Sequence, residues 1–146
     1  MRALVQRVKQ AEVRVAGTTV GKIANGLLVF VAIEPNDKVE NIECMARKLL
    51  SYRIFNDADG KMNLSLTDVR GGILVVSQFT LAADTSKGLR PSFTGAADKS
   101  QAKYLYELLL ERLGQLHHCV ASGQFGADME VSLINDGPVT FLLSER

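Results

Sequence analysis

The sequence has little of several residue types that would indicate a specialised class of protein. It contains two cysteines, three prolines and no tryptophan among 146 residues. Cys44 and Cys119 form no Cys-x-x-Cys pair, so we expect two buried free thiols and no disulfide framework. His117 and His118 precede Cys119, but no second pair of ligands has suitable spacing for a metal site. We therefore expect neither a metal ion nor a cofactor.

Long apolar runs and an excess of charge of one sign are also missing. No run approaches the ~18 apolar residues that a membrane-spanning helix needs, and the N-terminal segment lacks a signal-peptide core. Seventeen Lys and Arg against sixteen Asp and Glu give a formal net charge of +1. Any contact with nucleic acid must therefore come from a local basic patch. These absences predict a cytoplasmic protein with no membrane partner.

What the sequence does contain is typical of an ordinary globular protein. Hydrophobic residues make up 47% and charged residues 23%, which are the proportions of a protein with one packed core. The length predicts a single domain over residues 1–146.

The apolar pattern predicts β-structure in the first third of the chain and at its end. The segment 27–33 is apolar throughout and is expected to be a central strand covered on both faces. A turn at 16–18 and the Asn25-Gly26 pair separate the early strands. The predicted strands are 3–8, 11–15, 19–23, 27–33, 73–76, 129–134 and 139–143.

Two amphipathic helices are predicted between these strands. The first reaches from a capping box of Asp37 and Glu40 to about Tyr52, and the second begins at Asp98 with Gln101. The histidines near the end of the second helix are expected to complement its dipole. The buried stripes are predicted to be Val39, Ile42, Ala46, Leu49 and Leu50 in the first helix, and Tyr104, Leu105, Leu108, Leu109 and Leu113 in the second. The fold class is therefore α/β of the α+β type.

Residues 135–140 (Asn-Asp-Gly-Pro-Val-Thr) form a turn between two strand-like segments. Gly137 tolerates unusual backbone geometry and Pro138 fixes φ, and the bond between them can be cis at a cost of only about 0.5–1 kcal/mol. Such a turn can present two carbonyls in a fixed direction and so test the shape of a small ligand. The alternative is a hairpin turn with no further role.

A second polar segment lies at the end of the strand 73–76. Ser77, Gln78 and Thr80 offer hydroxyl and amide groups, and the main-chain N–H groups of Phe79 and Thr80 can stabilise an oxyanion if the sheet leaves them unpaired. No His, Asp or Glu is close in sequence, so a hydrolase triad cannot be built locally. The alternative is a strand that simply ends in capping hydroxyls. A long loop, 82–97, follows this segment and is expected to be functional or mobile.

These segments carry a resemblance to a known family. Residues 77–81 (Ser-Gln-Phe-Thr-Leu), with Ala83-Asp84, Lys87-Gly88 and 90–93 (Arg-Pro-Ser-Phe), resemble the first motif of the D-aminoacyl-tRNA deacylases. Residues 135–140 resemble their second motif, and the segments 1–8 and 123–129 are also similar. The resemblance covers nearly the full length in the family's order.

The resemblance implies a barrel-like arrangement of β-sheets and a homodimer with its sites at the subunit interface. The reaction implied is hydrolysis of the ester between a D-amino acid, or glycine mischarged on tRNA-Ala, and the terminal ribose of tRNA. The first motif of one chain would face the turn of the other. The Gly137-Pro138 bond would be cis, and its carbonyls would exclude an L side chain.

The remaining roles follow from the same resemblance. The N–H groups of Phe79 and Thr80 would hold the developing oxyanion, Gln78 would orient the ester, and Ser77 would contact the substrate. Arg7 would anchor the turn, and Met129 would pack against the terminal adenine. We expect no DNA partner. Four basic residues are candidates for tRNA contact: Lys87, Arg90, Lys99 and Lys103.

Two alternatives remain open at this point. Thr80 could act as a covalent nucleophile, although that mechanism needs a base that the sequence does not show. The protein could also be a non-catalytic module that uses the turn to bind RNA or a peptide terminus.

Overall fold

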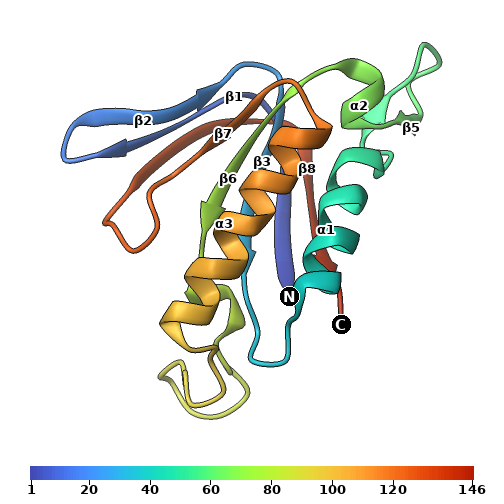
Figure 1. Ribbon diagram of the computed structural model, residues 1–146. Helices are drawn as coiled ribbons and strands as arrows, with labels where there is room; N and C mark the ends of the chain where they lie inside the picture. The colour runs from blue at the N-terminus through green and yellow to red at the C-terminus, as the bar shows by residue number, and fades with distance from the viewer.

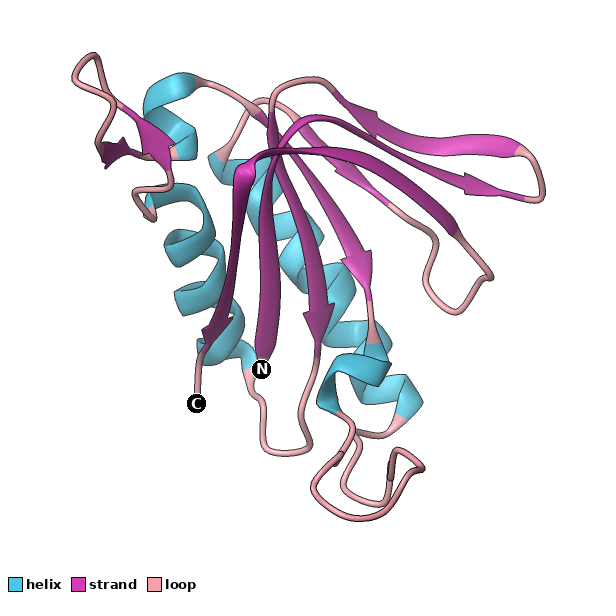
Figure 2. Cartoon of the chain, turned by 180° about the vertical axis from the view of Figure 1, so that it is seen from behind, coloured by secondary structure: helices cyan, strands magenta, loops and turns pink.

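The computed structural model describes residues 1–146 and shows a mixed α+β architecture, as the sequence predicted (Figure 1). Two long helices, α1 (Val39–Ser51) and α3 (Lys99–Leu116), cover one face of a curled sheet, and the view from behind shows the strands in front of them (Figure 2). The sheet consists of β1 (Arg2–Val15), β2 (Thr18–Ile23), β3 (Gly26–Ala32), β6 (Gly72–Ser77), β7 (Val120–Ser122) and β8 (Glu130–Ser144). The smaller elements are β4 (Phe55–Asn56), β5 (Met62–Leu64), α2 (Leu66–Val69) and the 3-10 helix η1 (Phe79–Ala82).

The long strand β1 organises the sheet. It pairs with β8 along one edge, and along its other edge it pairs first with β3 and then with β2, all antiparallel. The prediction of two separate strands, 3–8 and 11–15, is wrong because the chain does not leave the sheet between them. Instead, the register with β8 shifts between Val8 and Gln10. An irregularity of this kind bends a strand while its pairing continues on both sides.

Strands β3 and β6 run parallel and are connected through α1, with Leu27 opposite Ile73 and Val31 opposite Ser77. Both strands are apolar nearly throughout, which is typical of strands covered on both faces. Ile73 belongs to the core beneath the helices, whereas Leu74 belongs to the core on the opposite face. The prediction of a central strand covered on both faces is confirmed.

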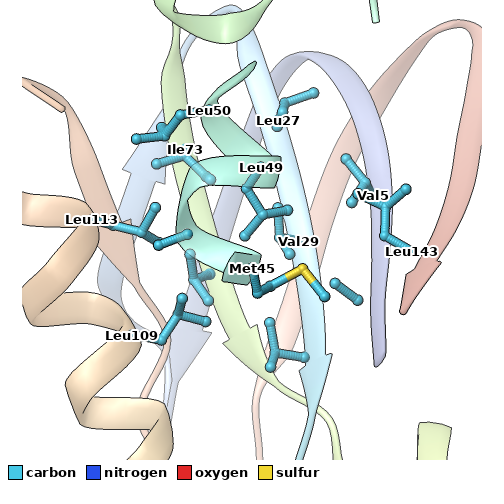
Figure 3. Packing of buried hydrophobic residues seen from close by; sticks show 14 of the residues in the cluster. Val5, Leu27, Val29, Met45, Leu49, Leu50, Ile73, Leu109, Leu113 and Leu143 are labelled. Atoms are coloured by element: carbon cyan, nitrogen blue, oxygen red, sulfur yellow. The ribbon is translucent and has the colours of Figure 1, made fainter. Parts of the chain in front are cut away.

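Two cores follow from this arrangement. The larger one contains 22 buried residues between the sheet and the two helices, with Met45 and Leu49 of α1 beside Val29 and with Leu109 and Leu113 on α3 (Figure 3). The smaller one contains seven buried residues that fill the inside of the curled sheet. The curl brings β2 back to β7, where a Cβ on Gly21 would lie only 2.3 Å from the carbonyl oxygen of Ser122. The sheet is therefore close to a closed barrel.

The buried stripes of the helices differ from the prediction at one position in each. Val39 is 44% exposed at the start of α1, and Tyr104 is 59% exposed on α3. Tyr106 takes the buried place instead, and its hydroxyl donates to the carbonyl of Val75 at 2.8 Å. The hydrogen bond satisfies the phenol, and burial raises the pKa of Tyr106 to about 12.

The helix starts also differ. Asp98 caps α3 as predicted, because its carboxylate accepts from the N–H of Ser100 at 3.0 Å. Asp37 does not cap α1, which begins after Lys38. Its carboxylate instead accepts from the α-amino group of Met1 at 2.7 Å and from the N–H of Glu34 at 2.7 Å. The predicted capping box at Asp37 and Glu40 is therefore wrong, since a charged partner distant in sequence uses the carboxylate.

The cysteines depart from the prediction, and His117 makes a contact at the end of α3 that the sequence did not show. The thiols are free, but Cys44 is exposed and Cys119 is only partly buried, so the prediction of two buried thiols is wrong. His117 ends α3, and its Nε2 lies 2.6 Å from the carbonyl oxygen of Gly71, which links the helix end to the start of β6. No helix combines the length and the apolar character that crossing a membrane requires.

Candidate active site

The predicted polar segment lies where β6 leaves the sheet. Ser77 is the last residue of β6, and the N–H of Gln78 donates to the carbonyl of Val31 at 2.8 Å. The chain then turns into η1. The alternative of a strand ending in capping hydroxyls is not supported, because no side-chain hydrogen bond caps η1.

The first main-chain N–H groups of η1 are those of Phe79 and Thr80. Within η1, the earliest donor is Leu81, whose N–H bonds to the carbonyl of Gln78 at 3.2 Å. The first N–H groups of a helix have no acceptor inside it. Both Phe79 and Thr80 are exposed, and the side-chain amide of Gln78 donates to the hydroxyl of Thr80. The geometry thus offers N–H donors at the surface beside an amide.

A cavity of about 550 Å³ opens beside this segment. Its walls are mainly apolar and come from the ends of β3 and β6, the start of α3 and the segment before β8. The lining residues are Val31, Ile33, Val76, Ser77, Gln78, Phe79, Ala82, Ala96, Ala97, Lys99, Ala102, Phe125, Gly126, Ala127, Asp128, Met129 and Val131. A mainly apolar pocket with a few polar groups is typical of a small-molecule site.

Four of the predicted site residues line this cavity: Ser77, Gln78, Phe79 and Met129. Thr80 is exposed on η1 and is not part of the lining. Met129 reaches the wall because Gly123 leaves room for it: a Cβ on Gly123 would lie 2.7 Å from the sulfur. Sequence reasoning did not place Phe125 and Asp128 in a site. The only signal for them was the family-like segment 123–129, which named no role for either residue.

The second predicted segment is not a turn between two strands. Strand β8 is continuous from Glu130 to Ser144, and residues 136–139 bulge out of it: Asn135 lies opposite Val8, and Thr140 lies opposite Gln6. The prediction of a turn that separates two strands, including the hairpin alternative, is therefore wrong. The strand keeps its pairing with β1 on both sides because the extra residues are looped outward, as in a β-bulge.

The side chain of Asn135 forms hydrogen bonds across the bulge. Its Oδ1 accepts from the N–H of Val139 at 2.8 Å, and its Nδ2 donates to the carbonyl of Val139 at 3.1 Å. The same Nδ2 contacts Gln6 Oε1 at 3.0 Å and Thr140 Oγ1 at 3.2 Å. One side chain thus holds both main-chain groups of Val139 and so fixes the width of the bulge.

Arg7 anchors the bulge to a neighbouring segment of the chain. The arginine is only 7% exposed; its Nε donates to the carbonyl of Asp136 at 2.9 Å, and its Nη1 donates to the carbonyl of Ile54 at 2.9 Å. Nη1 also contacts Asn56 Oδ1 at 3.3 Å, and the Asp136 carboxylate lies 3.7 Å from Nε. The predicted anchoring contact is present, and the acceptor is the carbonyl of Asp136.

The tip of the bulge is exposed and made of main chain. The Gly137–Pro138 bond is cis, and both residues are exposed. Gly137 has φ +148°, and a Cβ there would lie 2.6 Å from Val139 Cγ2, so only glycine fits. No side chain donates to the carbonyls of Gly137 or Pro138.

The two predicted halves of the site do not meet within one chain. The bulge lies beside Arg7, which is opposite Leu27, whereas Ser77 is opposite Val31. The halves are separated by three strand spacings of about 4.8 Å and four residues of about 3.3 Å, or on the order of 20 Å along the sheet. The cavity lining contains neither Arg7 nor any residue of the bulge.

The cavity wall carries one cation and one anion, Lys99 and Asp128. Lys87, Arg90 and Lys99 form no ion pair, while Lys103 lies 3.7 Å from Glu107. Lys99 also begins α3, at the positive end of the helix dipole, where a cation is unfavourable. In the nearby loop, hydrogen bonds from the hydroxyl and the N–H of Ser86 lower the pKa of Asp84.

The comparisons with known proteins agree with these features. The family model described as D-Tyr-tRNA(Tyr) deacylase matches residues 4–144. The chain is 60% identical over 143 residues to a D-aminoacyl-tRNA deacylase of Pseudomonas fluorescens, covering 98% of this chain and 99% of the relative. It is 54% identical over 144 residues to one of Saccharophagus degradans, covering 99% of each.

Two solved structures extend the comparison to three dimensions. The c-Myc DNA Unwinding Element Binding Protein superimposes with a TM-score of 0.95 and 40% identity, covering 100% of this chain and 99% of that one. A probable eukaryotic D-amino acid tRNA deacylase superimposes with a TM-score of 0.85 and 19% identity over 97% of each chain, which shows a shared fold. With the match over residues 4–144, the resemblance predicted from the sequence is confirmed, and the chain belongs to the D-Tyr-tRNA(Tyr) deacylase family.

Proposed function

We propose that this protein hydrolyses the ester between a D-amino acid and the terminal ribose of tRNA, releasing the free amino acid and the tRNA. The observation that carries the proposal is a cavity of about 550 Å³ whose mainly apolar wall includes Gln78 and Phe79, the first residue of η1. The relatives that are 54–60% identical over nearly their whole length carry the name of this activity.

The site is suited to an ester that needs positioning more than acid–base help. The N–H groups of Phe79 and Thr80 would stabilise the carbonyl oxygen as it becomes negative, and a donor of this kind typically contributes about 2.7–4 kcal/mol. The neighbouring ribose 2′-hydroxyl would assist the attack of water, and it would also distinguish RNA from DNA. Gln78 would orient the ester, with Ser77 beside it at the end of β6.

A covalent mechanism through Thr80 is less well supported. The hydroxyl of Thr80 receives a hydrogen bond from the side-chain amide of Gln78. An amide N–H is a donor and cannot remove a proton from the hydroxyl, so Thr80 lacks the adjacent base that activates a hydroxyl nucleophile.

Selection for handedness would come from the bulge of a second copy of the chain. One chain keeps the bulge on the order of 20 Å from its own cavity along the sheet, and the bulge tip is exposed. Docked against the partner's η1, the carbonyls of Gly137 and Pro138 would leave no space for an L side chain, which is specificity by rejection. Glycine has no side chain and would pass, including glycine mischarged on tRNA-Ala.

The terminal adenosine would occupy the apolar part of the cavity, with its base against Met129. Lys87, Arg90, Lys99 and Lys103 lie on the loop before α3 and on the first turns of that helix, and they would contact tRNA phosphates. Binding through phosphates weakens steeply as salt is raised. A binding constant that does not change with salt would remove this part of the proposal.

The experiment that tests the function compares the release of free tyrosine from D-tyrosyl-tRNA and from L-tyrosyl-tRNA by the purified protein. The proposal expects rapid release from the D ester only. Binding of tRNA without release would favour a non-catalytic module, as would tight binding of DNA, which we do not expect here. Loosening the bulge with Asn135→Ala is expected to lower the D-to-L ratio of rates, because the N–H and the carbonyl of Val139 both lose their hydrogen bond to this side chain.

A mixing experiment tests whether two chains build each site. Gln78→Ala alters the cavity half of the site, and Asn135→Ala alters the bulge half. When the two variant chains are unfolded, mixed and refolded together, an isologous dimer contains one site with neither change. Activity above the sum of the separate variants is expected; activity equal to that sum would show that the halves act within one chain.

A further inference from the structure

The cavity has an aromatic wall that continues outside it. The Phe79 ring lines the cavity, yet Phe79 is 64% exposed. The ring of Phe93 lies against it, with centroids 5.3 Å apart and planes at 49°, and Phe93 is itself 38% exposed without lining the cavity. The apolar surface therefore extends past the space that one nucleoside would fill.

The loop that carries Phe93 is held in place at its base. The main-chain groups of Asp84 and Ser92 exchange two hydrogen bonds of 2.9 and 3.0 Å, and the Ser92 hydroxyl lies 2.6 Å from that of Thr94. Phe93 directly follows this bridge. The aromatic pair, Phe79 and Phe93, is thus anchored from two sides and does not depend on the tip of the loop for its position.

The tip of the same loop carries charge and apolar surface together. Leu89 is fully exposed, with a relative accessibility of 103%, and Lys87 and Arg90 flank it without ion-pair partners. Residues 85–97 include these two cations and no Asp or Glu. A fully exposed leucine between unpaired cations has no role in the chain's own core.

We propose that the aromatic pair and the loop tip form a binding surface for the unpaired nucleotide that precedes the terminal adenosine. The base would stack on the ring of Phe93, which packs on Phe79 and lies outside the cavity, because the partner's bulge of the proposed dimer would lie against η1. Lys87 and Arg90 would contact the phosphates on either side. Aromatic rings beside a positive surface are the usual means of binding single-stranded nucleic acid. The inference rests on the proposed function, since it extends the substrate that the cavity would hold.

The charge favours RNA over a second copy of the chain as the occupant of Phe93 and the loop tip. The core of a protein–protein interface is depleted in lysine, and covering Lys87 with protein would bury a cation that has no partner. A phosphate neutralises a cation of this kind and releases counterions. Bases stacked on aromatic residues contribute enough to be measured by alanine substitution.

Two small esters test the inference directly. D-Tyrosyl-adenosine contains only the nucleoside that the cavity would hold. The D-tyrosyl ester of cytidylyl-adenosine also contains the preceding nucleotide, which would reach the proposed surface. The wild-type protein is expected to have a higher kcat/KM for the dinucleotide ester. Phe93→Ala is expected to reduce that preference by about 5- to 150-fold, the range of one stacked base. Arg90→Gln is expected to reduce the preference less than Phe93→Ala does. It should also lower the slope of log kcat/KM against log salt concentration by about 1.

Matched controls lie at the other end of the molecule. Val20 is an exposed apolar residue on β2, and Lys61 is an exposed cation in the β4–β5 hairpin. Val20→Ala and Lys61→Ala are expected to keep the wild-type preference for the dinucleotide ester. An unchanged preference in Phe93→Ala would overturn the inference. So would a loss of dimer in sedimentation with equal losses on both esters, which would identify the surface as an interface between copies. Hydrolysis of neither ester by the wild-type protein would instead overturn the proposed function.

Discussion

Replacement of Arg7 by methionine is the most informative single change that the structure suggests. Methionine keeps the length and the apolar stem of arginine and removes the guanidinium. The guanidinium donates to the carbonyls of Asp136 and Ile54 at 2.9 Å each, and the side chain is 7% exposed. The change therefore deprives two main-chain carbonyls of a charged donor where water has little access.

The magnitude follows from these two contacts. A hydrogen bond from a charged group contributes about 1.5–3 kcal/mol, so two of them amount to about 3–6 kcal/mol. That is a large part of the 5–15 kcal/mol that stabilises a typical domain. For a chain of this size, each kcal/mol shifts the melting temperature by about 2–4 °C. We expect Arg7→Met to melt on the order of 10 °C below the wild-type protein.

The control is Arg14→Met on the same strand. Arg14 is exposed, and its Nε contacts only Glu12, at 2.9 Å. Surface pairs of this kind contribute little, so its urea midpoint should stay close to that of the wild-type protein. Urea unfolding of the three proteins at neutral pH measures the difference. The reasoning is refuted if Arg7→Met and Arg14→Met unfold at the same urea concentration.

The other predictions concern chemistry, pH and packing. Thr80→Ala should hydrolyse D-tyrosyl-tRNA at close to the wild-type rate, whereas a loss of several orders of magnitude would revive the covalent mechanism. Burial raises the pKa of Tyr106 from 10.0 to about 12, so between these pH values the folded state keeps a proton that the unfolded state loses. The contribution of Tyr106 to the free energy of unfolding is therefore complete below about pH 10 and is lost as the pH rises through 12. Urea unfolding between about pH 10 and 12 should therefore show the wild-type protein losing about 3 kcal/mol of stability that Tyr106→Phe does not lose. Parallel curves for the two proteins would contradict this assignment. Gly26→Ala would place a Cβ 1.8 Å from the carbonyl oxygen of Gly72 and should cost about 3 kcal/mol or more. Gly114→Ala, with nothing within 4 Å of the new Cβ, should instead stabilise α3 by about 0.5–1 kcal/mol; equal melting temperatures for the two glycine variants would rule out the proposed close approach.

Much of the fold could be predicted because the spacing of apolar residues along the sequence indicates which of them are buried. The apolar run 27–33 indicated a strand covered on both faces, and Asp98 indicated the start of α3; both agree with the structure. Asp37 could not be assigned from local sequence, because its partner is the α-amino group of Met1, distant along the chain. Tyr106 was missed in favour of Tyr104, because a buried hydroxyl needs an acceptor that only the folded sheet supplies.

The sequence identified the two segments of the candidate site but not their arrangement in three dimensions. The polar residues after β6 and the Gly-Pro segment stood out by residue type alone. The sequence could not show that residues 136–139 bulge from a strand that stays paired on both sides, since that depends on the register with β1. Asn25-Gly26 illustrates the same limit: it was interpreted as a turn signal, while Gly26 is required for its close approach to Gly72.

The filled interior of the curled sheet decides how a ligand can come and go. Seven side chains occupy that space, so a visiting molecule must rest on the rim and cannot enter the barrel. Its arrival and departure therefore need no parting of strands. Amide hydrogens in the middle of β6 exchange only through global opening of the fold. A ligand on the rim should therefore slow them as much as the other core amides, by the factor with which it stabilises the folded state.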